Sequence, residues 1–594
     1  MTDPAVALRQ ALRLLQVGEP AQAHAACAEA LIAAPGDPKA LHLMGLIAMA
    51  LDRPDEAIDR LRQAVAADPN SPELRGNLGL ALSHAGRHAE AVEQFRLGLA
   101  ISPDDPTLLK ELALALLEGG QAEAAIPPLT RALAVAPRDA ELHGTLGRVL
   151  YRLERDDEAL GPLLTAAGLA PDDAGLAVHL GLVLRRLGRD EDSLTCFETA
   201  VALDPGHAEA LNALGQALTE RGDYQQGETH LRAALKRRPR FADAWANLGA
   251  ALLRQRKVGD AVAACTNAVR VDPDHVEGHC TLALAQLTRG QFEDGFKAHE
   301  WRWQRGASRT PRPRFDRPAW TGDLVGRTLL LHGEQGVDDT IQFARYIPLA
   351  ARRVDKVVLL CHPDLRGLLA TVPGVRQVVG FGETLPAFDR HAPLMSLPRL
   401  FGTTLDTVPA PVPYVAAPDG DHPAARAVRV MAGPRRRGEP LKVGICWAGR
   451  PGVPDRSCPL ELLTPLTTVP GTAFFSLQKG PRAADLAGHQ APISDLGPML
   501  GDVQDMAAAI QALDLVVTVD GTVAHLAGAL GQTAWLLLTY AADWRWLLDR
   551  DDSPWYPTLR LFRQDQAGAW EPVVARLRSA LAAGPGLNPR SGRR

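Results

Sequence analysis

Apolar residues in the first half of the chain recur at helical spacing, and their pattern repeats every 34 residues. Leucines four positions apart, such as Leu78 with Leu82 and Leu146 with Leu150, predict amphipathic helices. Three positions of the cycle keep the same step: Pro35, Pro69, Pro103, Pro137, Pro171, Pro205, Pro239 and Pro273; Gly45, Gly79, Ala113, Gly147, Gly181, Gly215, Gly249 and Ala283; Ala57, Ala91, Ala125, Ala159, Ser193, Gly227, Ala261 and Gly295. Three registers that hold one period over eight cycles indicate a repeat array.

Each cycle is predicted to be a pair of antiparallel helices. The glycine and alanine positions allow the two helices to approach closely, and the proline cannot continue the second helix, so it turns the chain into the next pair. A single pair cannot bury its own apolar face, and stacking of neighbouring pairs does so. We expect an α-solenoid of about nine repeats over residues 4–303.

From about residue 306 the period disappears, and short apolar runs alternate with helical stretches. Alternating strand and helix predict parallel sheets covered on both faces. The proline-dense stretch VPAPVPYVAAPDGDHP separates two groups of runs, which predicts two Rossmann-like α/β lobes at residues 325–420 and 440–583 with a cleft between them. The runs are RTLLLH, KVVLLC and VRQVVGF in the first group, and LKVGICW, TAFFSLQ, LDLVVTV and AWLLLT in the second.

Two further segments complete the predicted organisation. Residues 304–324 connect the array to the first lobe as an ordered strap, because Phe315 and Trp320 are expected to be buried. The tail at residues 584–594 is expected to be disordered.

Composition narrows the class of protein. The 594 residues carry a formal net charge of −5, which gives no reason to expect a nucleic-acid partner. The seven cysteines form no CxxC pair, which argues against zinc or a disulfide framework and favours a reduced compartment. The N-terminus does not read as a signal peptide, and no apolar run reaches membrane-spanning length. We therefore expect a cytoplasmic protein with no membrane span, metal or cofactor.

Polar residues gather where predicted strands end, which is where open α/β sheets bind ligands. In the second lobe, LDLVVTV ends at Asp520, Gly521 and Thr522, and a helix carrying His525 follows. A strand, a turn of small residues and a helix N-terminus predict an anion site. In the first lobe, the strand of LLLHGEQGVDDTIQF delivers Gly333, Glu334, Gln335, Gly336, Asp338 and Asp339 to the cleft.

The turn after the first strand, residues 333–339, has two possible chemical interpretations. It contains neither the Walker GxxxxGK[ST] motif nor the GxGxxG fingerprint, and adjacent carboxylates would repel a phosphate. One aspartate can instead face the cleft and take a proton from an attacking hydroxyl. Alternatively, Asp338 or Asp339 is the N-cap of the next helix. His525 likewise is either a donor contact or a structural helix histidine.

The second half of the chain resembles a known family. The phrases EWRW, GEQGVDDTIQFARY, FDRHAPLMSLPRLFG, VGICWAG, RSCPLELLTPL, FFSLQ, VDGTVAHLAGALG, DWRWLLDRDDSPWYP and LRLFRQ together resemble the glycosyltransferase domain found behind tetratricopeptide repeats in many bacterial proteins. That domain is similar to the heptosyltransferase-type superfamily with its two-lobed GT-B fold. Repeats followed by two such lobes are also similar to the O-linked N-acetylglucosamine transferases.

The resemblance implies an inverting, metal-independent transferase that uses a nucleotide-sugar as donor substrate. Asp339 matches the general base, Asp520 to His525 match the donor-binding turn, and Arg456 matches a cation beside the donor phosphates. Gln478 and Lys479 resemble residues that contact the nucleotide. The resemblance further implies that the repeat groove binds a protein or peptide, either the acceptor or a partner, although the array could instead be a spacer or a homodimer surface.

Three departures from the family pattern fall at the proposed site. Asp338 stands where relatives carry glycine, Gly521 stands where they carry threonine, and the loop GRPGVPDRS is shorter than theirs. These departures favour an alternative function, a weakened or inactive transferase-fold scaffold that acts through its repeats. A regulator that binds carbohydrate or nucleotide is a third possibility. The sequence leaves the sugar, the nucleotide and the acceptor open.

Overall fold

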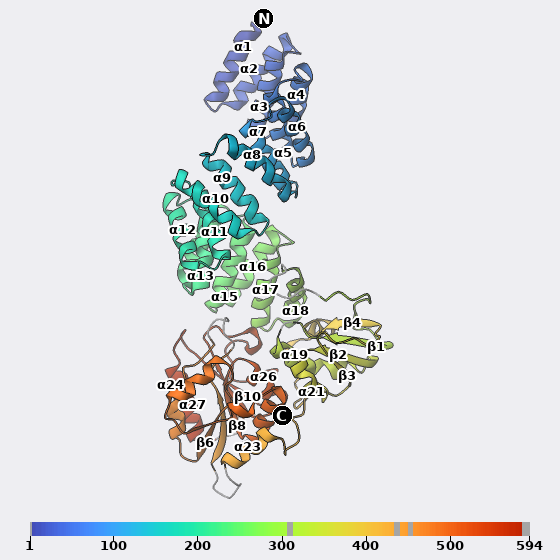
Figure 1. The fold of residues 1–594 in the computed structure, drawn as a ribbon, viewed down its shortest axis with the longest axis vertical. Helices are drawn as coiled ribbons and strands as arrows, with labels where there is room; N and C mark the ends of the chain where they lie inside the picture. The colour runs from blue at the N-terminus through green and yellow to red at the C-terminus, as the bar shows by residue number, and fades with distance from the viewer. Residues whose placement is uncertain (1–2, 306–312, 335, 433–439, 450–455, 585–594) are drawn as a thin grey trace. The chain divides into compact units, whose positions relative to one another are not determined.

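The computed structural model describes residues 3–305, 313–334, 336–432, 440–449 and 456–584. The chain forms two compact units, Met1–Pro239 and Arg240–Arg594. This division lies inside the predicted array, because the last repeat helices share a core with the second half of the chain. Figure 1 shows the helical stack and the two sheets. The predicted tail lies outside the described residues, apart from Gly584.

The first unit consists of helix pairs. Its helices are α1 (Pro4–Gln16), α2 (Pro20–Ala33), α3 (Pro38–Ala50), α4 (Pro54–Ala67), α5 (Pro72–His84), α6 (His88–Ile101), α7 (Pro106–Glu118), α8 (Ile126–Val135), α9 (Ala140–Arg152), α10 (Asp156–Leu169), α11 (Ala174–Arg186), α12 (Asp190–Leu203), α13 (Ala208–Arg221) and α14 (Tyr224–Arg237), with a 3₁₀ turn, η1 (Ala122–Ala125), before α8. Each repeat proline follows the second helix of a pair, as predicted.

In seven of the eight pairs that follow a repeat proline, the first helix begins at a side-chain cap two residues after the proline; α15, which follows Phe241, is the exception. Asp37, Asp105 and Asp139 each accept a hydrogen bond from a main-chain N–H in the first turn of the helix that follows. Such a cap satisfies a donor that the helix itself leaves unpaired. The 34-residue period therefore fixes the start of each helix pair as well as its end.

Close approach of paired helices depends on the predicted small residues. A Cβ built at Gly45 would lie 2.5 Å from Cγ of Leu61, and one at Gly181 would lie 2.5 Å from Cε1 of Phe197. In both cases the large side chain lies 16 residues further on, in the second helix of the pair. A side chain at the glycine would occupy the space that this residue fills, so the two helices would have to separate.

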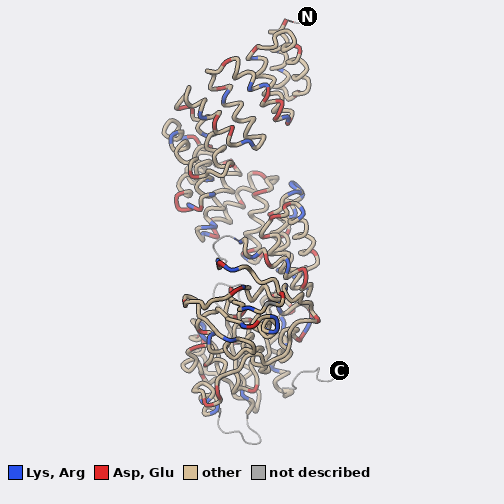
Figure 2. The backbone as a smooth tube through the Cα atoms, turned by 90° about the vertical axis from the view of Figure 1, so that its right-hand side faces the viewer, with Lys and Arg blue, Asp and Glu red and all other residues tan. Residues whose placement is uncertain are grey.

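Charged residues link neighbouring repeats at their surface. Lys110 pairs with Glu141 at 2.7 Å, and Arg186 pairs with Asp156 at 2.8 Å. Acidic and basic residues are interspersed along the helices (Figure 2). Partly exposed pairs of this kind contribute about 0–1 kcal/mol each, so apolar packing carries the stability of the array.

The second unit begins with the last helices of the array, α15 (Ala242–Arg254), α16 (Val258–Val271), α17 (Val276–Thr288), α18 (Phe292–Ala298) and the 3₁₀ helix η2 (His299–Gln304). After the strap comes a parallel sheet of β1 (Val325–His332), β2 (Val354–Cys361), β3 (Val375–Gly380) and β4 (Arg390–Pro393), in the order β3-β2-β1-β4. Its helices are α19 (Val337–Phe343), α20 (Ile347–Ala350), α21 (Arg366–Leu369) and α22 (Leu397–Leu400).

The two faces of this first sheet are covered differently. One face packs in the large core with Ile341 and Leu365. The other face packs against Phe315, Leu385 and Phe388, which come from segments outside the named helices and strands. Trp320 of the strap is only 2% exposed, and its main-chain N–H donates to the carbonyl of His391 at 2.8 Å. The strap therefore takes part of the role that helices were expected to fill.

The second sheet is also parallel and has six strands: β5 (Leu441–Cys446), β6 (Thr472–Ser476), β7 (Ile493–Asp495), β8 (Leu515–Val519), β9 (Ala534–Leu538) and β10 (Leu559–Arg563), in the order β10-β9-β8-β5-β6-β7. Its helices are α23 (Pro423–Ala432), α24 (Leu460–Leu463), α25 (Val503–Ala512), α26 (Thr522–Ala529) and α27 (Glu571–Ala582). The strand order reverses between β5 and β8, so the chain winds outward in both directions from this point.

The seven apolar runs each contain a strand, but three strands were not predicted. These are β4, β7 and β10. β4 has the sequence RHAP, and β7 has only three residues, so neither presents an apolar run. Helix α23, which lies between the two predicted lobes, packs against α25 and so belongs to the second lobe.

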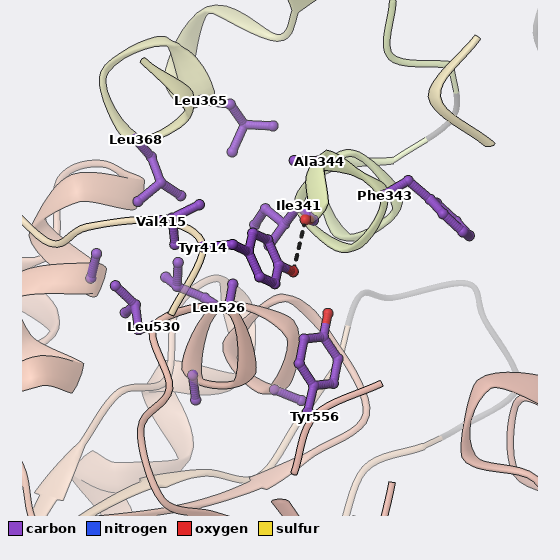
Figure 3. Packing of buried hydrophobic residues seen from close by; sticks show 14 of the residues in the cluster. Ile341, Phe343, Ala344, Leu365, Leu368, Tyr414, Val415, Leu526, Leu530 and Tyr556 are labelled. Atoms are coloured by element: carbon purple, nitrogen blue, oxygen red, sulfur yellow. Dashed lines mark hydrogen bonds between the residues drawn. The ribbon is translucent and has the colours of Figure 1, made fainter. Parts of the chain in front are cut away.

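A shared core joins the two lobes behind the cleft (Figure 3). Ile341 of α19 packs in the same cluster as Leu526 of α26, and the Tyr414 hydroxyl donates to the carbonyl of Ile341 at 3.0 Å. The buried guanidinium of Arg345 donates to main-chain carbonyls of Gln342 in the first lobe and Trp555 in the second. The lobes are thus packed together through apolar contacts and a fixed cation.

Substitutions at two helix glycines test the packing of the array. Gly181→Ala is expected to destabilise its repeat by about 1–3 kcal/mol, because the new methyl overpacks the contact with Phe197. In Gly161→Ala of α10, a Cβ meets nothing within 4 Å, so roughly 0.5–1 kcal/mol of stabilisation is expected from a better helix former. Hydrogen exchange of peptides from residues 156–203 in the full chain measures both effects. Equal effects of the two substitutions would contradict the close-approach argument.

Candidate active site

A cavity of about 420 Å³ opens at the reversal point of the second sheet. Cys446 at the end of β5 and Thr518 in β8 contribute to its floor, and residues after both strands line it. The carboxyl ends of parallel strands at such a point form the usual ligand crevice of this topology. Five of the predicted site residues line this cavity: Asp338, Gln478, Lys479, Gly521 and Thr522.

Gln478 is buried, and its side-chain amide forms hydrogen bonds with main-chain groups. Its Oε1 accepts from the N–H groups of Trp447 and Ala448 at 3.0 and 2.9 Å, and its Nε2 donates to the carbonyl of Ala448 at 3.1 Å. These bonds hold the turn after β5 in shape. Gln478 therefore positions the cavity wall, whereas Lys479 reaches across the cavity and donates to the carbonyl of Leu500.

The turn between β8 and α26 leaves room at the helix N-terminus. Gly521 is the N-cap residue, and its φ of 169° is an extended conformation that any residue can adopt. A Cβ built there meets nothing within 4 Å. Glycine in place of threonine is therefore not required by the backbone, and it enlarges the space in front of the free N–H groups of α26.

A second cavity of about 530 Å³ adjoins the first. Asp338, Gly449 and Gly521 line both cavities. The wall of the second cavity carries equal numbers of aspartates and arginines: Asp338, Asp339, Asp520 and Asp543 with Arg302, Arg305, Arg456 and Arg545. Cavities of this size suit small-molecule substrates.

Arg545 is the centre of the charge network, and the sequence analysis missed it. It lies in η10 (Trp544–Trp546), donates to Asp339, and pairs with Asp543 at 2.9 Å. Its Nε donates to Oε1 of Gln342 at 2.5 Å. The signal was available in DWRW, because an arginine between two large apolar residues is drawn into the protein and then needs a partner there.

Asp339 lies in the first turn of α19, where it faces Arg545. Gly336 is the N-cap residue of this helix, so neither Asp338 nor Asp339 occupies the cap position itself. Burial raises the pKa of the Asp339 carboxyl above its ordinary value, Arg545 opposes that rise, and the charges of Asp338 and Asp543 add to it. Such a carboxyl holds a proton more readily than an exposed aspartate does.

Arg456 is shared between two aspartates of the second lobe. Its Nη1 lies 2.7 Å from Oδ2 of Asp520, and its Nη2 lies 3.7 Å from Oδ2 of Asp543. Burial raises the pKa of Asp520 to about 6 in spite of the guanidinium. A third of the Arg456 side chain remains exposed, which leaves it able to contact a ligand in the cavity.

His525 is buried in the second cavity wall and is neutral. Its Nδ1 lies 2.9 Å from the Tyr556 hydroxyl, and its ring lies 5.4 Å from that of Trp546. Burial lowers the pKa of His525 to about 4, so it carries no charge near neutral pH. Since Nδ1 is engaged, a ligand contact would use Nε2.

The remaining residues of the first-lobe turn have structural partners. The N–H of Gly333 donates to the carbonyl of Leu360 at 2.8 Å. Glu334 forms a buried two-bond pair with Arg302 of η2, at 2.8 and 3.0 Å, and also accepts from the N–H of Met395. Glu334 therefore ties the last repeat to the first lobe. Gln335 lies outside the described residues.

The last repeat contributes part of the second cavity, which the sequence analysis did not anticipate. Cys280, Leu284 and His299 line it from α17 and η2. Nδ1 of His299 has no hydrogen-bond partner among the described residues, and burial together with Arg302 and Arg545 lowers its pKa well below the ordinary value. The repeat side of the cavity therefore combines Cys280, Leu284 and a neutral histidine with the cations Arg302 and Arg305.

The described residues show neither a metal-binding cluster nor a membrane-spanning helix. Within the ranges that the structure describes, no group of three or more His, Cys, Asp or Glu side chains is arranged to hold a metal ion. None of the helices in the same ranges has the length and apolar character that crossing a membrane requires.

Comparison with known families decides the nature of the helical array. One family profile, described as tetratricopeptide repeat, matches residues 8–59, 42–106, 110–174, 220–276 and 249–300, and a second profile of that description matches residues 172–240. Residues 8–300 carry tetratricopeptide repeats. Arrays of such repeats present extended concave surfaces.

One relative matches about half of the chain. Protein FlbA of Caulobacter vibrioides is 28% identical over an alignment of 360 residues, which covers 54% of this chain and 58% of FlbA. The chain thus spans little more than half the length of this relative.

Solved structures also show similarity. The Cut9–Hcn1 hetero-tetramer of the APC/C gives a TM-score of 0.38 at 17% identity, covering 47% of this chain and 55% of that one. PilF of Pseudomonas aeruginosa gives a TM-score of 0.32 at 20% identity, covering 35% of this chain and 94% of that one.

The Arg302–Glu334 pair offers a stability test. Arg302→Met is expected to destabilise the second unit by about 3–5 kcal/mol, because it leaves a buried carboxylate unpaired. The matched control is Arg305→Met, which breaks the more exposed pair with Glu277 and should cost about 1 kcal/mol or less. Denaturant unfolding monitored by tryptophan fluorescence distinguishes them. Similar losses for both variants would show that the buried pair does not tie the repeat to the lobe.

Proposed function

We propose that residues 325–583 form a GT-B glycosyltransferase that moves a sugar from a nucleotide-activated donor to a protein or glycan acceptor. The observation that carries this proposal is the pair of adjoining cavities. The first lies at the reversal point of a parallel sheet beside a helix N-terminus, and the second holds a buried carboxylate, Asp339. The resemblance of the sequence motifs supports the same assignment.

In this proposal the donor nucleotide occupies the cavity between β5 and β8, and its sugar enters the second cavity. Asp339 takes the proton from an acceptor hydroxyl, and the hydroxyl oxygen forms a bond to the anomeric carbon. The bond between that carbon and the phosphate oxygen breaks, so the phosphate departs with the electron pair and the anomeric configuration inverts. Arg456 and the N–H groups of α26 stabilise the charge on the leaving group.

The tetratricopeptide array supplies the acceptor or a partner protein in this proposal. Support comes from the cavity wall, to which the last repeat contributes Cys280, Leu284 and His299. A segment held by the array would approach the reaction centre from this wall.

A second candidate function is a transferase-fold scaffold without turnover. The observation that favours it is the pairing of the charged groups in the cleft. Asp339 is bound to Arg545, Arg456 is bound to Asp520, and Asp338 adds a negative charge where a phosphate would pass. A transferase must release some of these pairs when it binds its substrates.

A nucleotide panel separates the two candidates. Thermal unfolding is measured with UDP, GDP, ADP and CMP, because a ligand at 100 times its dissociation constant adds about 2.7 kcal/mol of stability. A clear shift with one nucleotide supports the transferase and identifies its donor class. A well-folded sample that responds to none of them supports the scaffold.

Asp339→Asn tests the assignment of the base. The amide keeps the size of the side chain but cannot accept the acceptor proton, so kcat is expected to fall roughly 10²- to 10⁴-fold. Binding of the nucleotide product, measured by calorimetry, should change little. Sugar transfer at the wild-type rate would remove Asp339 from the mechanism.

The pH dependence of kcat/KM tests how charges near Asp339 set its pKa. Removing the cation in Arg545→Gln should raise the pKa of Asp339 and move the acid limb of the profile to higher pH. Removing the negative neighbour in Asp338→Asn should lower the pKa and move the limb to lower pH. Arg545→Lys, which keeps the charge, should restore most of the wild-type profile. Shifts of the same sign in the first two variants would contradict this account.

A further inference from the structure

Asp338 stands at the junction of the two cavities. Its side chain lines both of them, together with Gly449 and Gly521. Thr522, the first residue of α26, donates its hydroxyl hydrogen to Oδ1 of Asp338. This bond joins the first turn of α19 in one lobe to the first turn of α26 in the other, so it crosses the passage between the cavities.

The Asp338 carboxylate lies at the N-terminus of α26, the end of the helix that attracts an anion. The helix is eight residues long, and the partial positive charge of its N-terminus favours a negative group at the position of Thr522. Gly521 has no side chain to fill the space in front of it. The structure therefore places a carboxylate of the protein itself in contact with the helix terminus that the proposed function assigns to the donor phosphate.

The four arginines of the second cavity all have acidic partners. Arg545 is committed to Asp339 and Asp543, and Arg456 is committed to Asp520. Arg302 and Arg305 are paired with Glu334 and Glu277. Lys479 lines the first cavity and donates to the carbonyl of Leu500. A phosphate that comes close to Asp338 would be repelled by the charge of its carboxylate.

We propose that Asp338 competes with the donor phosphate for the N-terminus of α26, and that the donor binds only when this carboxylate is displaced from Thr522. The inference rests on the proposed function, because it assigns the passage to a nucleotide-linked phosphate. It identifies Asp338 as a residue that sets which donors bind: each added phosphate charge is penalised, whereas the nucleoside is not.

The test measures binding of nucleoside, nucleoside monophosphate and nucleoside diphosphate to the wild-type chain and to Asp338→Asn. The asparagine keeps an oxygen that can accept from Thr522, so the comparison isolates the charge. Dissociation constants are measured by calorimetry at one fixed ionic strength, since salt screens the repulsion. Four bases are used, uracil, guanine, adenine and cytosine, because the donor is not identified.

The expected result is a graded change. Nucleoside affinity should be the same in both proteins, monophosphate affinity should rise in Asp338→Asn, and diphosphate affinity should rise further, by roughly tenfold, the scale of one like charge removed close to an anion. Asp338→Gly should give the same order. The matched control is Asp551→Asn, which removes an exposed carboxylate of the second lobe outside both cavities and should change none of the three constants.

Two results would overturn the inference. If a nucleoside diphosphate binds the wild-type chain and Asp338→Asn equally, or binds the variant more weakly, Asp338 does not compete with phosphate, and the proposed transferase function stands without it. If no nucleoside or nucleotide binds either folded protein, the proposed function fails, and the inference fails with it.

Discussion

The site depends on how Arg345 fixes the two lobes against each other. Its guanidinium is buried, and it donates to carbonyls of Gln342, Pro409 and Trp555 and to the Tyr414 hydroxyl. It also lies 4.4 Å from the ring centroid of Tyr556. Carbonyl dipoles and aromatic faces together stabilise a cation that burial would otherwise disfavour. Because these groups come from both lobes, the arrangement holds α19 opposite α26, and every cross-cleft contact follows from that placement.

The charge network of the cleft is the second consequence of this placement. Asp339 and Asp338 project from one short helix, yet they bind different elements of the second lobe, Arg545 and Thr522. Burial strengthens each of these interactions and raises the cost of leaving any member unpaired. The paired state is therefore a well-defined arrangement, and a ligand that contacts any of these groups has to exchange one set of partners for another.

The local pattern of apolar, glycine and proline residues was sufficient to predict much of the fold. The 34-residue period predicts the repeats because each helix pair packs mainly on its sequence neighbours, and the comparisons confirm them across residues 8–300. Apolar runs predicted the central strands, since buried parallel strands are apolar on both faces. The strand RHAP was missed because β4 has only four residues and lies at the end of the sheet, beside β1 and a single bridge from Ala319 to His391, so it presents no apolar run.

The candidate site was predicted less completely, for a physical reason. Strand ends identify Asp339, Asp520 and Thr522, because topology alone brings them to one edge. Their partners are not local: Arg545 reaches Asp339 across 206 residues of sequence. A buried ion pair at that separation depends on the packing of both lobes, which no short pattern encodes.

The wall formed by Cys280, Leu284 and His299 limits how this architecture can be taken apart. A cut at residue 303, between the repeats and the lobes, would remove one side of the cavity and expose the carboxylate of Glu334. Within unit Arg240–Arg594, the final repeat thus belongs to the wall of the cavity as well as to the array. The boundary between repeats and lobes in the sequence is therefore no boundary in the packing of this unit.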